Sequence, residues 1–340
     1  GKRGSDRQGT VTAAYGISGG NSGYPGEEGK MEILFLEPVF KQTVWGGSRL
    51  GSVFGYDIPG DDTGECWAVS AHPGGESRIK NGEYAGYTLG RLWKEERELF
   101  GSAQGEVFPL LTKIIDAKED LSIQVHPDDA YAGRYENGAL GKTECWYVLD
   151  CDEDATIVIG HHAGSREELR SMIEEGRWKE LIREVPVRKG DFFQINPGCV
   201  HAIKGGTMIL ETQQSSDITY RLYDYDRLSN GKKRELHIEK SLDVIEVPYK
   251  EAVTGEKHGG GSANAWFEEL VECSKYTVWK GTVKGKEILK QDRSFMLVSV
   301  IEGSGSIGST PVRKGDHFIL PCGFGEEEVC GDFTVICSAV

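Results

Sequence analysis

The chain contains the six-residue phrase Pro-Val-Arg-Lys-Gly-Asp twice, first from Pro186 and again from Pro311. A strand-like segment precedes each copy, and "ECWYVLDCDEDATIVIG" from Glu144 matches "MLVSVIEGSGSIGS" from Met296 in pattern. Six identical consecutive residues with a matching upstream segment favour an internal duplication over the chance recurrence of a common turn. We therefore predict that one strand–turn–strand unit is used twice, with an extra helical segment after Ile159 in the first copy.

Short apolar runs bounded by Gly, Pro, Asp and Asn recur along the chain, which is typical of strands joined by tight turns. The 46 glycines among 340 residues exceed the average of roughly 7% and fit a turn-rich architecture. This spacing predicts a β-sandwich or a closed barrel. The predicted strands are Cys66–Ala71, Leu121–His126, Cys145–Leu149, Thr156–Ile159, Asp191–Ile195, Met208–Glu211 and Ile218–Tyr223.

Two segments have the residue spacing of helices instead. Ser165 is a candidate N-cap, because Glu168 follows at capping-box distance and apolar residues then recur as far as Ile182. The second predicted helix covers Leu89–Leu99, within "GYTLGRLWKEERELFG". The first of these two helices accounts for the greater length of the first copy of the repeat.

The order of these elements resembles the second half of a cupin barrel. Strands are followed by a Lys-Gly-Asp turn, a further strand, a Pro-Gly turn and a histidine. Two copies predict a mainly β bicupin, with two β-barrel or jelly-roll cupin domains and a small helical insertion near 165–184. We assign residues 31–245 to a metal-binding cupin and residues 255–340 to a degenerate cupin. Residues 1–30 lack hydrophobic periodicity, so we expect a disordered leader or an artificial extension there, with a flexible native arm as the alternative.

Four polar residues of the first copy form a candidate metal site. Gln124 and His126 stand two positions apart in an apolar run, so both side chains face the same side of a strand. Glu144 begins the next strand, where an inward carboxylate is costly unless it is paired or bound to a metal. His201 follows the Pro-Gly turn. Two imidazoles, a carboxylate and an amide oxygen form an open site that suits Zn²⁺, and also Fe²⁺, Mn²⁺ or Co²⁺.

The second copy lacks these groups. Met296 stands where the first copy has Glu144, and Gly325 or Glu326 stands in place of His201. We therefore predict that the first domain carries the chemistry and that the C-terminal domain, without metal ligands, is structural.

Charge and cysteine content narrow the class of protein further. A formal net charge of −15 disfavours a nucleic-acid partner or an anionic membrane surface, so a local cluster of Lys and Arg must hold any anionic substrate. The sequence has no apolar run of membrane-spanning length and no signal-peptide pattern. Its eight cysteines include no Cys-x-x-Cys pair, so we expect reduced thiols in a cytoplasmic protein.

Several longer stretches carry a resemblance to a known family. They include "LTKIIDAKEDLSIQVHPDD", "GKTECWYVLD", "PGCVHAI" and "ETQQSSDITYRLYDY". Together they closely resemble class I mannose-6-phosphate isomerase (phosphomannose isomerase) in its short bacterial form, over Met31–Val340. The resemblance implies interconversion of mannose 6-phosphate and fructose 6-phosphate by proton transfer through a cis-enediol. It also implies one divalent metal ion per chain, zinc before others, a phosphosugar as partner, and a monomer or weak homodimer.

The same resemblance assigns roles to individual residues. It implies that the metal ligands are Gln124, His126, Glu144 and His201. The family's active-site lysines correspond to Lys113 and Lys142, its serine corresponds to Ser122, and its acidic and basic cluster corresponds to Glu211, Asp217 and Arg221. For the catalytic base we favour Glu211, with Asp217 or a lysine as alternatives. Binding of the substrate is expected from Ser122, Lys142 and Arg221.

Two other classes of protein fit parts of the pattern. An iron-dependent cupin dioxygenase is one, because two histidines and one glutamate can form a facial triad. The basic residues Lys113, Lys142 and Arg221 argue against it, since an oxygenase needs no phosphate clamp. A non-enzymatic sugar-binding bicupin is the other, and the complete ligand set in one copy disfavours it. We expect Trp67 and His72 to pack in the barrel wall.

Overall fold

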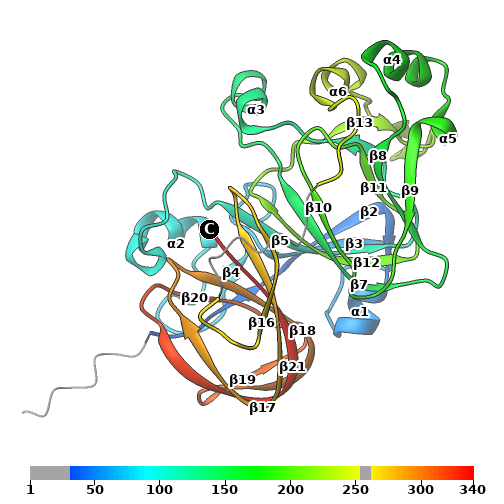
Figure 1. Cartoon of the computed structure of the whole chain (residues 1–340). Coiled ribbons are helices and arrows are strands. Elements are labelled where there is room, and N and C mark those ends of the chain that lie inside the picture. The colour runs from blue at the N-terminus through cyan, green and yellow to red at the C-terminus, as the bar shows by residue number, and fades with distance from the viewer. Residues whose placement is uncertain (1–30, 253–261) are drawn as a thin grey trace, which may run out of the picture. The chain divides into compact units, whose positions relative to one another are not determined.

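Antiparallel β-strands are the main secondary structure of this protein, as the computed structural model in Figure 1 shows. The structure describes residues 31–252 and 262–340, so the leader predicted for residues 1–30 lies outside the described residues. The mainly β class is confirmed. In residues 39–223, two sheets face each other as in a jelly roll, and neither closes into a barrel.

The first of these sheets has six strands in the order β10-β7-β12-β5-β2-β3, and the second has five in the order β13-β6-β11-β8-β9. Apolar side chains from both sheets, such as Ile115, Ile159 and Ile209, form one buried cluster between them. The strands of the six-stranded sheet are β2 (Val39–Gly47), β3 (Thr63–Val69), β5 (Leu110–Ala117), β7 (Glu144–Cys151), β10 (Phe192–Ile195) and β12 (Thr207–Gln214). Those of the five-stranded sheet are β6 (Ile123–Val125), β8 (Thr156–His161), β9 (Ile182–Pro186), β11 (His201–Ile203) and β13 (Tyr220–Tyr223).

The C-terminal strands, orange to red in Figure 1, form a third and larger sheet. Its strands are β16 (Phe267–Glu272), β17 (Thr277–Gln291), β18 (Met296–Ile307), β19 (Thr310–Arg313), β20 (His317–Leu320) and β21 (Gly325–Ala339). Two strands from the start of the chain, β1 (Leu34–Glu37) and β4 (Arg78–Ile79), extend this sheet, because β1 pairs with β20. Residues of the predicted first domain therefore complete the sheet of the second.

The repeated phrase forms the same turn twice. In the first copy Ile195 pairs with Glu144, and in the second Leu320 pairs with Met296, so Met296 does occupy the place of Glu144. Gly190 and Gly315 of the two turns both have φ of 91°, a left-handed conformation that glycine adopts at little cost. The duplication predicted from the sequence thus recurs in strand register and in backbone conformation.

Helices cover the outer face of the five-stranded sheet. The predicted helical insertion forms α4 (Arg166–Glu174) and α5 (Trp178–Leu181), and the Ser165 side chain accepts a hydrogen bond from the Glu168 amide, as a capping residue does. Buried residues of α4, α5 and α6 (Ile238–Val244) pack on this sheet. The other helices are α1 (Arg49–Phe54), α2 (Leu89–Glu95), the short 3₁₀ helix η1 (Arg97–Phe100) and α3 (Asp129–Tyr135). A short hairpin joins β14 (Leu228–Ser229) to β15 (Lys232–Lys233).

Two further expectations concern helices and thiols. The helix predicted over Leu89–Leu99 is divided into α2 and η1 at Glu96. All eight cysteines are free thiols. Within the described ranges, none of the helices combines the length and the apolar character needed to cross a bilayer.

Candidate metal centre and active site

Strand register brings three of the predicted site residues into one row on the five-stranded sheet. His201 of β11 stands directly opposite Gln124 of β6, and Gln124 in turn stands opposite Arg221 of β13. Residues that are directly opposite in an antiparallel pair project from the same face of the sheet. Strands β11 and β13, which come much later in the sequence than β6, therefore place an imidazole and a guanidinium on either side of the Gln124 amide.

A second row lies on the six-stranded sheet. Glu211 of β12 stands opposite Lys113 of β5 on one side and Trp146 of β7 on the other, and Lys113 stands opposite Trp67 of β3. All four side chains border one cavity, which Gln124 and Arg221 of the first row also line. The two facing sheets thus supply the two walls of the candidate site.

Three side chains converge behind Gln124, Lys142 and Trp146 of the cavity lining to form a candidate metal centre. Possible ligand atoms of His126, Glu144 and His201 all lie within 4.8 Å of one another, and all three residues are buried. The two imidazole Nε2 atoms are 3.1 Å apart, and each lies 3.4 Å from an oxygen of Glu144. The sequence prediction of these three residues as one site agrees with this geometry.

Hydrogen bonds on the far side of each ring fix the imidazoles for metal binding. His126 Nδ1 lies 2.8 Å from the carbonyl oxygen of Ile218, and His201 Nδ1 lies 2.8 Å from that of Cys199. A carbonyl oxygen only accepts hydrogen bonds, so each Nδ1 carries the ring hydrogen and each Nε2 presents a lone pair. Metal-binding histidines characteristically donate their other nitrogen in this way.

The electrostatic surroundings keep the ligands in the protonation states that a metal needs. Burial lowers the pKa of His126 to about 3 and also lowers the pKa of His201, so both rings are neutral at pH 7. Burial alone would raise the pKa of Glu144, but the neighbouring Lys142 ammonium holds it well below its usual range. Two neutral imidazoles and one carboxylate are the donor set expected of a site for a divalent cation.

The distances also fit a metal ion. Two nitrogen ligands about 2.05 Å from a tetrahedral zinc lie about 3.3 Å apart, close to the 3.1 and 3.4 Å separations found here. Gln124 faces the cluster with its amide nitrogen 3.4 Å from His201 Nε2, while its oxygen accepts a hydrogen bond from Ser122. An amide and its 180° flip have almost the same shape, and the flipped form turns the oxygen to the metal. The residues present therefore fit a divalent metal ion.

Lys142 links the metal centre to the second row. Its ammonium contacts a Glu144 oxygen and lies 3.2 Å from His126 Nε2 and 3.7 Å from Glu211 Oε1. Burial alone would lower the pKa of Lys142, but the two glutamates raise it, so the ammonium is charged. This ammonium therefore partly neutralises the buried carboxylates of Glu144 and Glu211.

Glu211 is the least satisfied carboxylate of the site. It is 3% exposed, and its Oε1 atom has no hydrogen-bond partner among the described residues, although Lys113 and Lys142 both stand 3.7 Å away. Burial and the nearby Glu144 charge raise the pKa of Glu211. A carboxylate that is desolvated, raised in pKa and open on one oxygen has the properties of a general base.

Trp146 is a site residue that the sequence analysis did not single out. Its indole N–H lies 3.0 Å from Glu211 Oε2 and 3.2 Å from Glu144 Oε1, so one donor serves both carboxylates. The available signal was its position two residues after Glu144 on the same strand, which puts both side chains on one face. Trp146 therefore orients the candidate base and a candidate metal ligand together.

Arg221 and Arg234 add two further cations to the lining of the cavity. The Arg221 Nε atom is buried without a hydrogen-bond partner in the described protein, and Arg234 lies close enough to contribute to its electrostatics. Arg234 also lines the cavity and is paired with Asp224. The sequence analysis missed Arg234, although it stands in the basic run "GKKRE". Two guanidinium groups beside Ser122 provide a site for an anion.

Trp67 and His72 were predicted to pack in the barrel wall, and both also contact residues of the candidate site. Trp67 lines the cavity, donates to Glu65 over 2.6 Å and lies 5.0 Å beneath the Lys113 ammonium. His72 accepts from the Gly74 amide through Nδ1, so its Nε2–H points to Asp217 at 3.4 Å. That hydrogen bond is the largest cause of the lowered pKa of Asp217.

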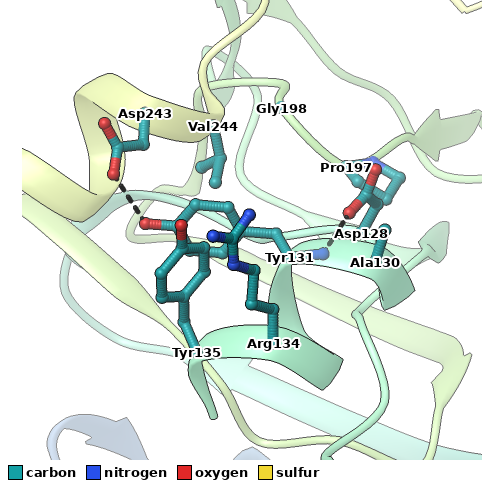
Figure 2. A pocket seen from close by; sticks show the side chains of 9 residues that line it. All are labelled: Asp128, Ala130, Tyr131, Arg134, Tyr135, Pro197, Gly198, Asp243 and Val244. Atoms are coloured by element: carbon teal, nitrogen blue, oxygen red, sulfur yellow. Dashed lines mark hydrogen bonds between the residues drawn. The ribbon is translucent and has the colours of Figure 1, made fainter.

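A larger groove lies between α3, α6 and the Pro197-Gly198 turn (Figure 2). The Tyr131 hydroxyl donates to Asp243 over 2.8 Å, and Asp128 caps α3 by accepting from the Tyr131 amide. Among the described residues, no side chain of this groove hydrogen-bonds to the side chains of His126, Glu144 or His201, whereas Gln124, Lys142 and Trp146 of the cavity between the sheets do so. Since most of the polar groups of the groove are already paired, we assign the chemistry to the cavity between the two sheets, which measures about 170 Å³.

The C-terminal sheet carries no equivalent centre. Met296, in the place of Glu144, is buried and apolar, and among residues 31–252 and 262–340 the His126–Glu144–His201 cluster is the only group of its kind. The fold and the site together define a bicupin with one candidate metal centre beside a cavity rich in cations. Residues 33–149 match the type I phosphomannose isomerase catalytic domain, and residues 267–340 match the mannose-6-phosphate isomerase cupin domain. The chain belongs to the type I phosphomannose isomerase family.

Individual relatives agree with this assignment. Mannose-6-phosphate isomerase ManA of Bacillus subtilis is 53% identical over 306 residues, which cover 88% of this chain and 96% of the relative. Mannose-6-phosphate isomerase of Streptococcus mutans is 48% identical, over 90% of this chain and 98% of the relative. The crystal structure of the Bacillus subtilis mannose 6-phosphate isomerase matches with a TM-score of 0.86 at 47% identity, over 91% of this chain and 100% of that chain. The resemblance and the isomerase class are confirmed, and neither the dioxygenase nor the sugar-binding alternative is supported.

Proposed function

We propose that this protein interconverts mannose 6-phosphate and fructose 6-phosphate with one bound zinc ion. His126, Glu144, His201 and the flipped Gln124 amide would hold the ion, which would act as a Lewis acid on the substrate's carbonyl and hydroxyl oxygens. The observation that carries the proposal is the position of Glu211. Its Oε1 atom, which has no hydrogen-bond partner among the described residues, lies in a cavity beside the ligand cluster, with each of two lysines 3.7 Å away.

The reaction needs one proton moved between two adjacent carbons. In the open-chain aldose, Glu211 takes the proton from C2, the electrons of that bond form a C1–C2 double bond, and the carbonyl π electrons move to O1, which gives a cis-enediolate. Return of the proton to C1, with transfer of the O2 hydrogen to O1, gives the ketose. The raised pKa of Glu211 suits this exchange, because a base works best when its pKa lies near the working pH.

The two lysines next to Glu211 have a different task. Lys113 and Lys142 stabilise the negative charge that develops on the substrate oxygens while the proton is on Glu211. Trp67 beneath the Lys113 ammonium holds that cation by a cation–π contact at 5.0 Å. Both lysines are buried, so their charges are poorly screened by water and act strongly on the substrate.

Arg221 and Arg234 bind the phosphate group. The buried Arg221 Nε has no hydrogen-bond partner in the described parts of the chain, and Arg221 stands beside Gln124, so its guanidinium can donate to phosphate oxygens in a forked geometry. Ser122 binds at the same end, since it lines the cavity beside Gln124. Asp217, held by His72, lies at the mouth of the cavity and assists ring opening of the sugar by accepting its hydroxyl hydrogen.

The test is an isomerase assay on metal-free and metal-loaded protein. Conversion of mannose 6-phosphate to fructose 6-phosphate is followed in deuterated water, so that exchange at C1 reports proton transfer through the enediol. We expect turnover with zinc, loss of turnover with a chelator, and recovery when zinc is added back. Absence of turnover in protein that contains one zinc per chain would overturn the proposal.

A further inference from the structure

A second cleft, of about 780 Å³, lies between the first copy of the repeated turn and the C-terminal sheet. Strands β7 and β12 contribute Tyr147, Leu149 and Met208 to it, while β17, β18 and β21 contribute side chains from the opposite side. Trp146 faces the catalytic cavity, so its neighbour Tyr147 faces the other side of the sheet. The cleft is therefore separate from the candidate active site.

The repeated lysines reach across this cleft in opposite directions. Lys189, from the first copy of the turn, pairs with Glu302 of the C-terminal sheet. Lys314, the same residue of the second copy, lies 4.9 Å over the ring of Phe54 in α1. Both lysines line the cleft. The repeated phrase therefore supplies a cation from each half of the protein to one shared space.

Two more lysines, Lys280 and Lys284, extend from β17 into the same cleft. Throughout residues 31–252 and 262–340, no carboxylate lies within ion-pairing distance of Lys280, Lys284 or Lys314. Asp150 and Asp332 also line the cleft, while Glu302 is occupied by Lys189. The three lysines exceed the two aspartates, and this local excess of positive charge stands out in a chain of net charge −15.

The Tyr147 side chain lines the cleft, and its hydroxyl has no hydrogen-bond partner among the described residues. Tyr147 is 7% exposed. Lys280 lies 5.9 Å from the centre of its ring. A hydroxyl at the cleft surface that has no partner among the described residues is free to donate a hydrogen bond to a bound molecule.

We propose that this cleft binds a small organic phosphate monoester that carries a flat ring. The cleft offers four donor groups, which are three ammonium groups and one phenol. A phosphate monoester has three terminal oxygens to accept hydrogen bonds from them, whereas a carboxylate has only two. Buried Phe54, Leu149 and Ile301 supply an apolar surface for the ring. The volume lies within the range of ~300–1,000 Å³ typical of metabolite sites.

Binding is tested with adenosine 5′-monophosphate, inorganic phosphate and adenosine as probes, by calorimetry on the full chain. We expect the monophosphate to bind more tightly than either fragment. Lys280→Met and Lys314→Met should each weaken its binding about tenfold, because each removes a charge-assisted hydrogen bond. Tyr147→Phe should weaken binding about threefold or more and leave the thermal unfolding of the free protein unchanged, since its hydroxyl has no partner to lose.

The controls separate this cleft from the catalytic cavity. Lys179→Met removes an exposed lysine of α5 and should leave binding of the monophosphate unchanged. Arg221→Met alters the catalytic cavity and should also leave it unchanged, while the cleft variants should keep the isomerase rate at saturating mannose 6-phosphate. Binding that is lost in Arg221→Met, or unchanged in all three cleft variants, overturns the proposal. So does the absence of binding by the monophosphate at millimolar concentration.

Discussion

The Nε2 atoms of His126 and His201 lie 3.1 Å apart, and neither carries a hydrogen to share with the other. Two lone pairs at this distance repel each other unless a cation accepts both. The nearby Lys142 ammonium reaches His126 at 3.2 Å and also contacts Glu144, so one cation already bridges part of the cluster. A divalent ion would satisfy all three ligands together, and the first prediction tests this.

Replacement of His126 by Ala should abolish isomerase activity and lower the metal content. The variant loses one of two imidazole ligands, and removal of a direct ligand leaves too few donors to hold the ion. Metal analysis and the isomerase assay on the same sample check this. His162→Ala is the matched control, because His162 is exposed and lies outside the cluster. A His126→Ala protein with full zinc and full rate would show that the ligand assignment is wrong.

Replacement of Glu211 by Gln should reduce kcat by about 10²–10⁴-fold, the range typical of a lost general base. The amide keeps the shape and the hydrogen bond partner Trp146, so KM should change little. Glu65→Gln is the informative comparison, since Glu65 also borders Lys113 but has one oxygen occupied by Trp67. If Glu65→Gln lost more activity than Glu211→Gln, the base would be Glu65 instead.

Replacement of Trp146 by Phe should shift the pH dependence of kcat. Its indole donates to the ionised forms of Glu211 and Glu144, so its removal raises the pKa of Glu211 further. The acid limb of the kcat profile should therefore move to higher pH, with a loss of about tenfold at neutral pH. Trp93→Phe is the control, because the Trp93 indole nitrogen is buried without a hydrogen-bond partner in the described chain. Identical profiles for wild type and Trp146→Phe would contradict the prediction.

The ligand cluster was predictable from sequence because its members stand in short local patterns. Gln124 lies in β6 and His126 directly follows its last residue, and the residues on either side of Gln124 are apolar, so the inward face was evident from alternation. Likewise, the repeated turn was visible as identical letters, and the lack of ligands in the second copy followed from comparing Met296 with Glu144. Such inferences need only the period of a strand.

The rest of the site depended on pairing between distant segments. Trp146 and Lys113 both flank Glu211, but the three lie on separate strands whose order no local pattern reveals. Arg234 reaches the cavity from a loop after β15, and His72 reaches Asp217 across the site. For the same reason, the pairing of β1 with β20 could not be foreseen, because it joins the two ends of the described chain.

Replacement of Arg221 by Met should raise KM for mannose 6-phosphate by about 10–100-fold, because a charge-assisted hydrogen bond to phosphate contributes roughly 1.5–3 kcal/mol. Arg221→Lys should recover only part of this, since lysine lacks the forked donors. Arg170→Met is the control, because Arg170 forms its ion pairs on the surface. Steady-state kinetics separate the outcomes, and an unchanged KM in Arg221→Met would exclude Arg221 from phosphate binding.

The last prediction concerns how the free energy of unfolding depends on pH. His317 of the C-terminal sheet is buried, and its ring contacts the Tyr56 hydroxyl at 2.7 Å and Ser299 Oγ at 2.8 Å. Burial, with a smaller contribution from Lys80, lowers its pKa to about 3. Between pH 6.5 and pH 3 the unfolded chain therefore binds a proton that the folded protein excludes, so stability falls as the pH falls.

This single histidine should contribute a slope of up to about 1.4 kcal/mol per pH unit to the free energy of unfolding in that window. His317→Phe introduces the residue that the first copy of the repeat has at this position, Phe192. The variant loses two hydrogen bonds, so it should be less stable at pH 7 and yet lose less stability than wild type on acidification. Denaturant unfolding at pH 7, 6, 5 and 4 measures both effects. Parallel stability curves for the two proteins would show that His317 is not the group that binds the proton on unfolding.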